Sequence, residues 1–144
     1  MTPHYDLLIR GGTVVDGTRA PRFDADVGIS GGRIAAIGNL GSVTADETID
    51  AAGRIVAPGF IDAHTHDDRL LFTDPLMTPK LSQGVTTVVV GNCGVSLAPL
   101  GTKEPVPPLN LVVGGDGPFF DSMAGYVAAL ERTPAALNCA ILAG

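Results

Sequence analysis

The sequence predicts a mixed α/β fold in which a small β domain, residues 1–56, precedes a region of alternating strands and helices, residues 57–144. Three observations favour this arrangement. Short apolar segments, separated by turn residues about every 8 to 12 positions, fill the first part. The β-branched run Val85–Val90 is typical of a strand buried on both faces of a parallel sheet. Around that run, strand-like and helix-like segments alternate, which favours parallel strands joined by crossover helices.

The predicted β domain consists of short strands with glycine turns between them. Gly11-Gly12 is expected to make a tight turn between the first two strands, and Gly31-Gly32 makes another further along the chain. Strands and turns at this spacing predict a small β-sandwich or sheet domain, and the sandwich is the architecture we expect. The predicted strands are Tyr5–Ile9, Thr13–Val15, Asp26–Ile29, Arg33–Ile37, Asp46–Ile49 and Arg54–Val56.

The second region is predicted to hold three strands and two helices. One helix should cover residues 74–83 and stop at Gly84. A second should begin at Asp121 or Ser122, present one apolar face, and end before Pro134. That apolar face consists of Met123, Tyr126, Val127 and Leu130, and the expected strands are Phe60–Ala63, Val85–Val90 and Asn138–Leu142.

The order of these elements fits either a barrel or an open parallel sheet. In both architectures the chemistry takes place at the carboxyl ends of the strands. The Gly/Pro-rich segment 91–118 follows one such strand end and is predicted to be a long functional loop.

Charge and composition argue against several classes of protein. The net charge is −6 with a pI near 4.7, whereas nucleic acids and anionic membranes select for clusters of Lys and Arg. No apolar run approaches the roughly 18 residues of a membrane span, and the first residues lack the pattern of a secretory signal. Two cysteines do not make a disulfide framework. We therefore expect a cytoplasmic protein with a small-molecule partner, and neither nucleic acid nor membrane as partner.

His64 and His66 are the first candidates for chemistry, because they follow the first predicted strand of the second region. Residues i and i+2 of a strand project from the same face, so two imidazoles at this spacing can bind one metal ion. The plainer interpretation is a polar strand end with two solvated histidines. Asp67 and Asp68 follow and could orient metal ligands through their carboxylates.

Cys93 follows the next predicted strand and would lie at the same sheet edge as the two histidines if the strands are neighbours. A thiolate is a good zinc ligand, whereas most cysteines of cytoplasmic proteins are small buried residues without reactivity. Cys139 lies within an apolar strand and is interpreted as structural. Asp62 lies within a predicted strand, where a buried carboxylate needs a partner. The Gly114–Gly117 turn lacks the lysine of a phosphate-binding loop and is interpreted as an ordinary loop.

Several segments resemble a known family. The motif ending in His64-Thr65-His66 is similar to the opening of the amidohydrolase superfamily, in which a β domain precedes a metal-dependent (β/α)₈ barrel. The Asn92-Cys93-Gly94 element is similar, more narrowly, to the D-aminoacylases, the N-acyl-D-amino-acid deacylases. The matching segments are Val56–His66, Tyr5–Gly12 and Asp50–Gly53 for the superfamily, and His66–Asp68, Met77–Thr87 and Gly91–Gly94 for the deacylases.

The resemblance implies a function and a fold. It makes His64, His66 and Cys93 ligands of Zn²⁺, and it makes residues 57–144 the first strands and helices of a truncated (β/α)₈ TIM-type barrel. Two further histidines and a general-base aspartate are then expected downstream of Gly144, since His4 matches no ligand of the family. The implied reaction is zinc-dependent hydrolysis of a linear amide, an N-acyl-D-amino acid, to a D-amino acid and a carboxylate.

Two alternatives to this function stay open. A cyclic-amide hydrolase of the same superfamily, similar to the dihydroorotases and hydantoinases, would use a carboxylated lysine on a later strand instead of Cys93. A non-catalytic fragment is an alternative of a different class. By itself the 144-residue chain is expected to show no deacylase activity and to bind zinc weakly, because the later ligands and the aspartate are not among its residues.

Overall fold

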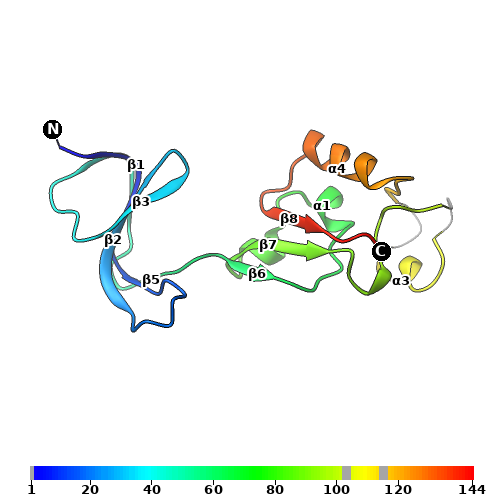
Figure 1. Ribbon diagram of the computed structural model, residues 1–144, viewed down its shortest axis with the longest axis horizontal. Coiled ribbons are helices and arrows are strands. Elements are labelled where there is room, and N and C mark those ends of the chain that lie inside the picture. Colours follow the sequence, from blue (N-terminus) through cyan, green and yellow to red (C-terminus); the bar gives the residue numbers. More distant parts are fainter. Residues whose placement is uncertain (1, 102–104, 114–116) are drawn as a thin grey trace. The chain divides into compact units, whose positions relative to one another are not determined.

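The computed structural model describes residues 2–101, 105–113 and 117–144 (Figure 1). The chain divides into two compact units, Met1–Pro58 and Gly59–Gly144. The first unit is built of strands, and the second combines parallel strands with short helices. The predicted mixed α/β fold is therefore confirmed.

The first unit is one mixed five-stranded sheet, in the order β3-β2-β1-β4, with β5 also paired to β1. β1 runs antiparallel to β2 along one edge and parallel to β4 and β5 along the other. The described residues of the first unit therefore form a single sheet and not the expected β-sandwich. The long strand β1 pairs with β2, β4 and β5, which places all of them in one layer. The strands are β1 (His4–Val14), β2 (Phe23–Ser30), β3 (Arg33–Gly38), β4 (Thr44–Asp50) and β5 (Ile55–Val56).

The predicted turn at Gly11-Gly12 is wrong, because β1 continues through both glycines. Its register against β2 shifts between Ile9 and Gly12, which is the signature of a β-bulge. Gly11 takes the left-handed φ of 71° that such a bulge requires, and its N–H donates to the Asp26 carboxylate at 2.8 Å. Because this hydrogen bond replaces the ladder bond lost at the bulge, the Gly11 N–H is not left unpaired, and β1 can bend there without ending. The predicted Gly31-Gly32 turn between β2 and β3 is confirmed.

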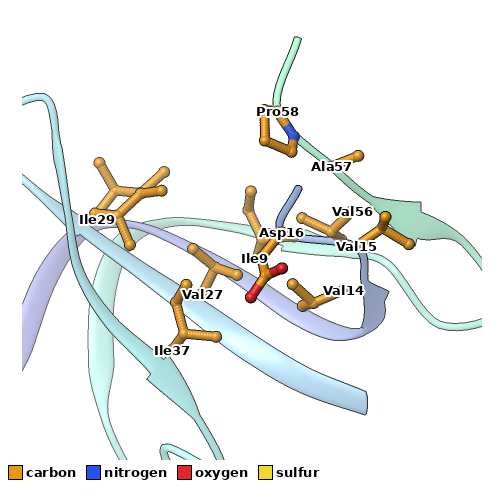
Figure 2. Close-up of a pocket in the computed structure, with 11 residues that line it drawn as sticks. Ile9, Val14, Val15, Asp16, Val27, Ile29, Ile37, Val56, Ala57 and Pro58 are labelled. Carbon is orange, nitrogen blue, oxygen red and sulfur yellow. The ribbon is translucent and has the colours of Figure 1, made fainter. Parts of the chain in front are cut away.

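A buried hydrophobic cluster of the first unit lies on one face of this sheet. Val14, Ala25 and Val27 are buried there. Beside them is an apolar hollow of about 360 Å³, and Figure 2 shows several of the aliphatic side chains that line it. Ile34 and Ile37, which also line it, are 65% and 43% exposed. Within the described residues of the first unit, this apolar face has no second layer of strands over it.

The second unit is built on three parallel strands in the order β6-β7-β8, each of which is followed by helical segments or the chain end (Figure 1). All three expected strands are confirmed, and the predicted run Val85–Val90 is the central strand. Its Val88 and Val90 are fully buried, whereas the opposite face of the strand is half-buried. The elements are β6 (Phe60–Asp62), α1 (Leu70–Thr73), α2 (Thr78–Leu81), β7 (Val85–Val90), the 3₁₀ turn η1 (Asn92–Gly94), α3 (Leu109–Val113), α4 (Met123–Arg132) and β8 (Asn138–Ile141).

The helix predicted over residues 74–83 is wrong in extent. The structure has two four-residue helices, α1 and α2, on either side of a turn. Pro75 disfavours the helical conformation at Asp74, and Met77 takes a left-handed φ of 50°, so a continuous helix cannot form. Gly84, with φ 78°, ends the segment as expected.

The helix predicted after Asp121 or Ser122 is confirmed as α4. The Ser122 hydroxyl caps it by accepting the N–H of Gly125 at 3.1 Å. Tyr126 and Ala129 are its buried residues, whereas Val127 of the predicted apolar face is 41% exposed. Tyr126 stacks on Phe120 with ring centroids 5.2 Å apart, which anchors α4 to the segment before it.

The segment 91–118, predicted as a loop, contains η1 and α3. Two buried residues of this segment, Val95 and Leu97, pack in one hydrophobic cluster with Tyr126. The Gly114–Gly117 turn lies, but for its last residue, outside the described residues. None of the helices that the structure describes is long and apolar enough to cross a membrane.

Candidate metal centre

His64, His66 and Cys93 come together where β6 and β7 end. One ligand atom from each lies within 4.8 Å of the other two, and no other such group of three occurs in the described part of the chain. The Nε2 atom of His64 is 3.2 Å from the Sγ atom of Cys93, and the two imidazole rings meet edge to face at 5.7 Å. The parallel pairing of β6 with β7 brings the two loops together, although 29 residues separate His64 from Cys93.

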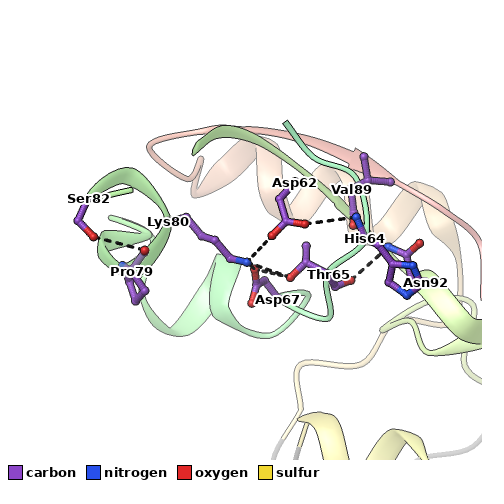
Figure 3. Close-up of polar contacts among 9 residues, drawn as sticks. All are labelled: Asp62, His64, Thr65, Asp67, Pro79, Lys80, Ser82, Val89 and Asn92. Atoms are coloured by element: carbon purple, nitrogen blue, oxygen red, sulfur yellow. Dashed lines mark hydrogen bonds and ion pairs between the residues drawn. The ribbon is translucent and has the colours of Figure 1, made fainter. Parts of the chain in front are cut away.

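The two loops are tied to each other by backbone and amide hydrogen bonds. The N–H of Thr65 donates to the carbonyl of Val89 at 3.2 Å, which extends the pairing one step beyond β6. The side-chain amide of Asn92 donates to the carbonyls of Thr65 and Val89, at 3.2 and 2.7 Å (Figure 3). Asn92, the residue before Cys93, therefore ties the histidine loop to the turn that carries Cys93.

Cys93 is held in a backbone conformation that is rare for a residue with a side chain. Its φ of 58° is left-handed, and it lies between Gly91 and Gly94, with φ of 80° and 70°. A non-glycine residue in this region costs about 1–2 kcal/mol, and such strain clusters at functional sites. The tight turn Gly91–Gly94 aims the exposed thiol toward His64.

The Asp68 carboxylate binds the backbone of the same turn. It is 1% exposed and accepts the N–H of Gly91 at 3.2 Å and the hydroxyl of Tyr126 at 3.4 Å. Burial raises the pKa of the Asp68 carboxyl against the lowering effect of these hydrogen bonds. Asp67 and Asp68 were expected to orient metal ligands. Their described hydrogen bonds go to neighbours of the ligands and not to the histidine rings, because Asp68 accepts from the Gly91 backbone and Tyr126, whereas Asp67 accepts from Thr65 and Lys80.

Lys80 of α2 is the residue near the site that the sequence did not reveal. Its ammonium group donates to Asp62 at 2.6 Å, to Asp67 at 2.9 Å and to the Thr65 hydroxyl at 3.3 Å (Figure 3). Hydrogen bonding to Lys80 lowers the pKa of Asp62. Burial favours neutral Lys80, but the hydrogen bonds to Asp62 and Asp67 outweigh it and raise the pKa of Lys80. The one available signal was Asp62 itself, a carboxylate in a strand that required a partner.

The donor set fits zinc. Two imidazoles and one thiol are ligands that Zn²⁺ prefers, and tetrahedral bonds of the usual length place a nitrogen and a sulfur ligand about 3.5 Å apart. The observed separation between His64 Nε2 and Cys93 Sγ is 3.2 Å. The Nδ1 atom of His66 is buried and has no hydrogen-bond partner, so this ring is not committed to another protein group through that atom.

The other cysteine has a different environment. Cys139 lies on β8, is half-buried, and packs beside the cluster of Val88 and Val90. Burial raises the pKa of the Cys139 thiol to about 11. At neutral pH this thiol stays protonated, as expected of a structural cysteine.

Thiol labelling should therefore separate the two cysteines. At pH 8 a thiol-reactive dye should label exposed Cys93 within the fast phase, whereas Cys139 should react at least about 100-fold more slowly because only a small thiolate fraction is present. The measurement is the labelling rate of the chain and of its Cys93→Ala and Cys139→Ala variants. A fast phase that persists in Cys93→Ala would contradict the assignment.

Comparison with known proteins places the chain. The sequence profile of the amidohydrolase family matches residues 47–138. A D-aminoacylase of Alcaligenes xylosoxydans xylosoxydans is 53% identical over 140 residues, which are 97% of this chain and 29% of that protein. The chain thus spans about 29% of the length of this curated relative.

Solved structures agree with the sequence match. A D-aminoacylase with a binuclear metal centre superposes with a TM-score of 0.91 and 52% identity, covering 97% of this chain and 30% of the other. An N-acyl-D-glutamate deacylase from Bordetella bronchiseptica, in complex with zinc and a phosphonate inhibitor, superposes with a TM-score of 0.87 and 48% identity. The match covers 99% of this chain and 30% of the other. The resemblance to the D-aminoacylases is confirmed along the whole sequence, and the chain belongs to the amidohydrolase family.

Proposed function

We propose that this chain supplies the first metal ligands of a zinc-dependent amidohydrolase that hydrolyses N-acyl-D-amino acids. The observation that carries the proposal is the convergence of His64, His66 and Cys93, with their ligand atoms within 4.8 Å of one another. Water is consumed across a linear amide bond, and the products are a D-amino acid and a carboxylate. Support for the substrate class comes from the relatives, an aminoacylase and a deacylase with about half of their matched residues identical.

The proposed roles follow from the residues at the site. Cys93 would bind the metal as a thiolate and both histidines as neutral imidazoles, which neutralises one positive charge of the ion. Zinc bound there supplies a Lewis acid for the scissile carbonyl. Asn92 keeps the two ligand loops at a fixed distance, and Asp68 holds the amide of Gly91 so that the turn retains its left-handed conformation. The general-base aspartate that the family resemblance implies is assigned to a position downstream of Gly144.

We further infer that β6, β7 and β8 are the first strands of a (β/α)₈ barrel, with residues 1–56 as the β domain and 57–144 as the barrel portion. The parallel order β6-β7-β8 supports this inference, as does the position of the three ligands beyond the carboxyl ends of β6 and β7, where barrel enzymes place their active sites. The cyclic-amide alternative has less support, because the relatives with about half of their matched residues identical are an aminoacylase and deacylases.

The experiment is a substrate comparison on the intact gene product that contains this chain. We expect hydrolysis of N-acetyl-D-amino acids, at least about 100-fold slower turnover of the L enantiomers, and loss of activity with a chelator that is reversed by added Zn²⁺. The Cys139→Ala variant serves as the matched control for Cys93→Ala and should retain its metal. Ring opening of hydantoins in place of deacylation, or activity unaffected by the chelator, would contradict the proposal.

A further inference from the structure

We propose that Lys80 is a positioning residue of the metal centre, which holds the His64-Thr65-His66 loop by binding side chains on both sides of the two histidines. The inference rests on the proposed function, since it gives Lys80 a role toward the same zinc site. Lys80 lies in α2, outside the strand-end loops that carry the ligands, and it is one of two lysines in the chain.

The three hydrogen bonds of Lys80 use all the donors of its ammonium group. Asp62 Oδ2 accepts at 2.6 Å, Asp67 Oδ2 at 2.9 Å and Thr65 Oγ1 at 3.3 Å. The Lys80 side chain is only 22% exposed, and those of Asp62 and Asp67 are 29% and 21% exposed. A long, flexible lysine side chain with three acceptors and little exposure is fixed in one conformation, unlike a lysine of an ordinary surface ion pair.

The acceptors of Lys80 connect onward to the ligand loop itself. The second oxygen of Asp62 accepts the backbone N–H of His64 at 3.3 Å, and the Thr65 hydroxyl donates to Asp67 at 2.6 Å. Figure 3 shows the ammonium group of Lys80 among these side chains. The loop is thus anchored before His64, between the two histidines and after His66, and Lys80 binds the anchoring side chain at each of these places.

Charge alone would predict the opposite effect of removing Lys80. Without its positive charge the site becomes more negative, which favours a cation, but at partly exposed positions this raises affinity only a few-fold. Loss of the anchors leaves Asp62 and Asp67 without a cation between them and frees the loop. Residues that orient metal ligands typically account for 10- to 100-fold in affinity, so the loss of position should outweigh the gain in charge.

The test measures the zinc affinity of the intact gene product that contains this chain, by competition with a chromophoric chelator. Lys80→Met keeps the length of the side chain and removes its charge, and Lys80→Arg keeps the charge and the donors. Ser122→Ala removes the N-cap of α4 and serves as the control for a general loss of stability, because the described hydrogen bond of the Ser122 side chain is to Gly125 of α4. Cobalt absorption spectra report the ligand geometry, and hydrogen exchange of the His64 and Thr65 amides reports loop order without metal.

We expect Lys80→Met to bind zinc 10- to 100-fold more weakly, with an altered cobalt spectrum and faster exchange at His64 and Thr65. Lys80→Arg should recover most of the affinity, and Ser122→Ala should keep all of it. Equal affinity of the parent protein and a folded Lys80→Met variant would overturn the role of Lys80 and leave the metal site standing. Absence of zinc binding by the parent protein would overturn the proposed metal site itself. If Lys80→Met does not fold, Lys80→Gln takes its place under the same criteria.

Discussion

Cys93→Ala should lower the affinity of the chain for Zn²⁺ by more than about 100-fold. Loss of a residue that merely orients a ligand costs 10- to 100-fold, and loss of a ligand atom should cost more. The Cys93 side chain is exposed and contributes little to packing, and alanine occupies the same left-handed φ at a cost similar to that of cysteine. The effect should therefore appear in metal binding and not in the free energy of unfolding. Competition with a chromophoric chelator and a urea titration measure the two quantities.

The matched control for this variant is Cys139→Ala, which removes the other thiol of the chain. Its thiol lies on β8, and its substitution should leave zinc affinity within about twofold of the parent value, since Cys139 is not among the three converging residues. His66→Ala should reproduce the loss seen with Cys93→Ala. Zinc binding by Cys93→Ala at the parent affinity would show that other donors hold the metal.

Gly91→Ala is expected to lower the free energy of unfolding of the second unit by about 2–4 kcal/mol. Gly91 has a φ of 80°, which costs alanine about 1 kcal/mol, and a Cβ atom there would overlap the backbone carbonyl of Leu142. Backbone atoms cannot move aside as a flexible side chain can, so the overlap adds about 1–3 kcal/mol. The turn that carries Cys93 would move as well, because the N–H of Gly91 donates to Asp68.

Gly94→Ala provides the control for Gly91→Ala. Gly94 has a similar φ of 70°, but a Cβ atom there would meet nothing within 4 Å. Its substitution should cost only about 1 kcal/mol, the cost of the left-handed conformation. Urea unfolding followed by tyrosine fluorescence in a Tyr5→Phe background reports the second unit, because Tyr126 is then the remaining tyrosine. Equal destabilisation by the two substitutions would show that the contact with Leu142 does not matter.

Local sequence patterns predicted the elements that depend on neighbouring residues alone. The β-branched run Val85–Val90 became β7 with the same bounds, and Ser122 became the cap of α4. The helix over 74–83 failed where Pro75 and the left-handed Met77 interrupt it. The Gly11-Gly12 turn failed for a different reason, since the carboxylate of Asp26, on another strand, satisfies the amide of Gly11 and keeps the strand intact.

The sequence predicted the candidate ligands of the site, but it did not predict which side chains hold those ligands in place. His64, His66 and Cys93 were found because ligand-type residues follow two predicted strands, and the structure brings them together. Asp68 was predicted to orient metal ligands, and the structure shows it binding the backbone of Gly91, 23 residues later, in the turn that carries Cys93. Lys80 lies in the segment Met77–Thr87 that resembles the deacylases, but no residue pattern indicated its role, which depends on α2 placing it within reach of Asp62 and Asp67.

The sequence by itself determined the mixed α/β class, the parallel strands of the second unit and the three candidate ligands. The class and the strands follow from residue periodicity, which acts over short stretches of chain, and the ligands follow from the rule that parallel strands end at a common edge. Only the tertiary structure decided which side chains hold those ligands: Asn92 between the loops, Asp68 beneath the turn and Lys80 across the histidine loop. Hydrogen bonds and ion pairs of this kind depend on distances in space between residues far apart in the chain, and no local pattern encodes those distances.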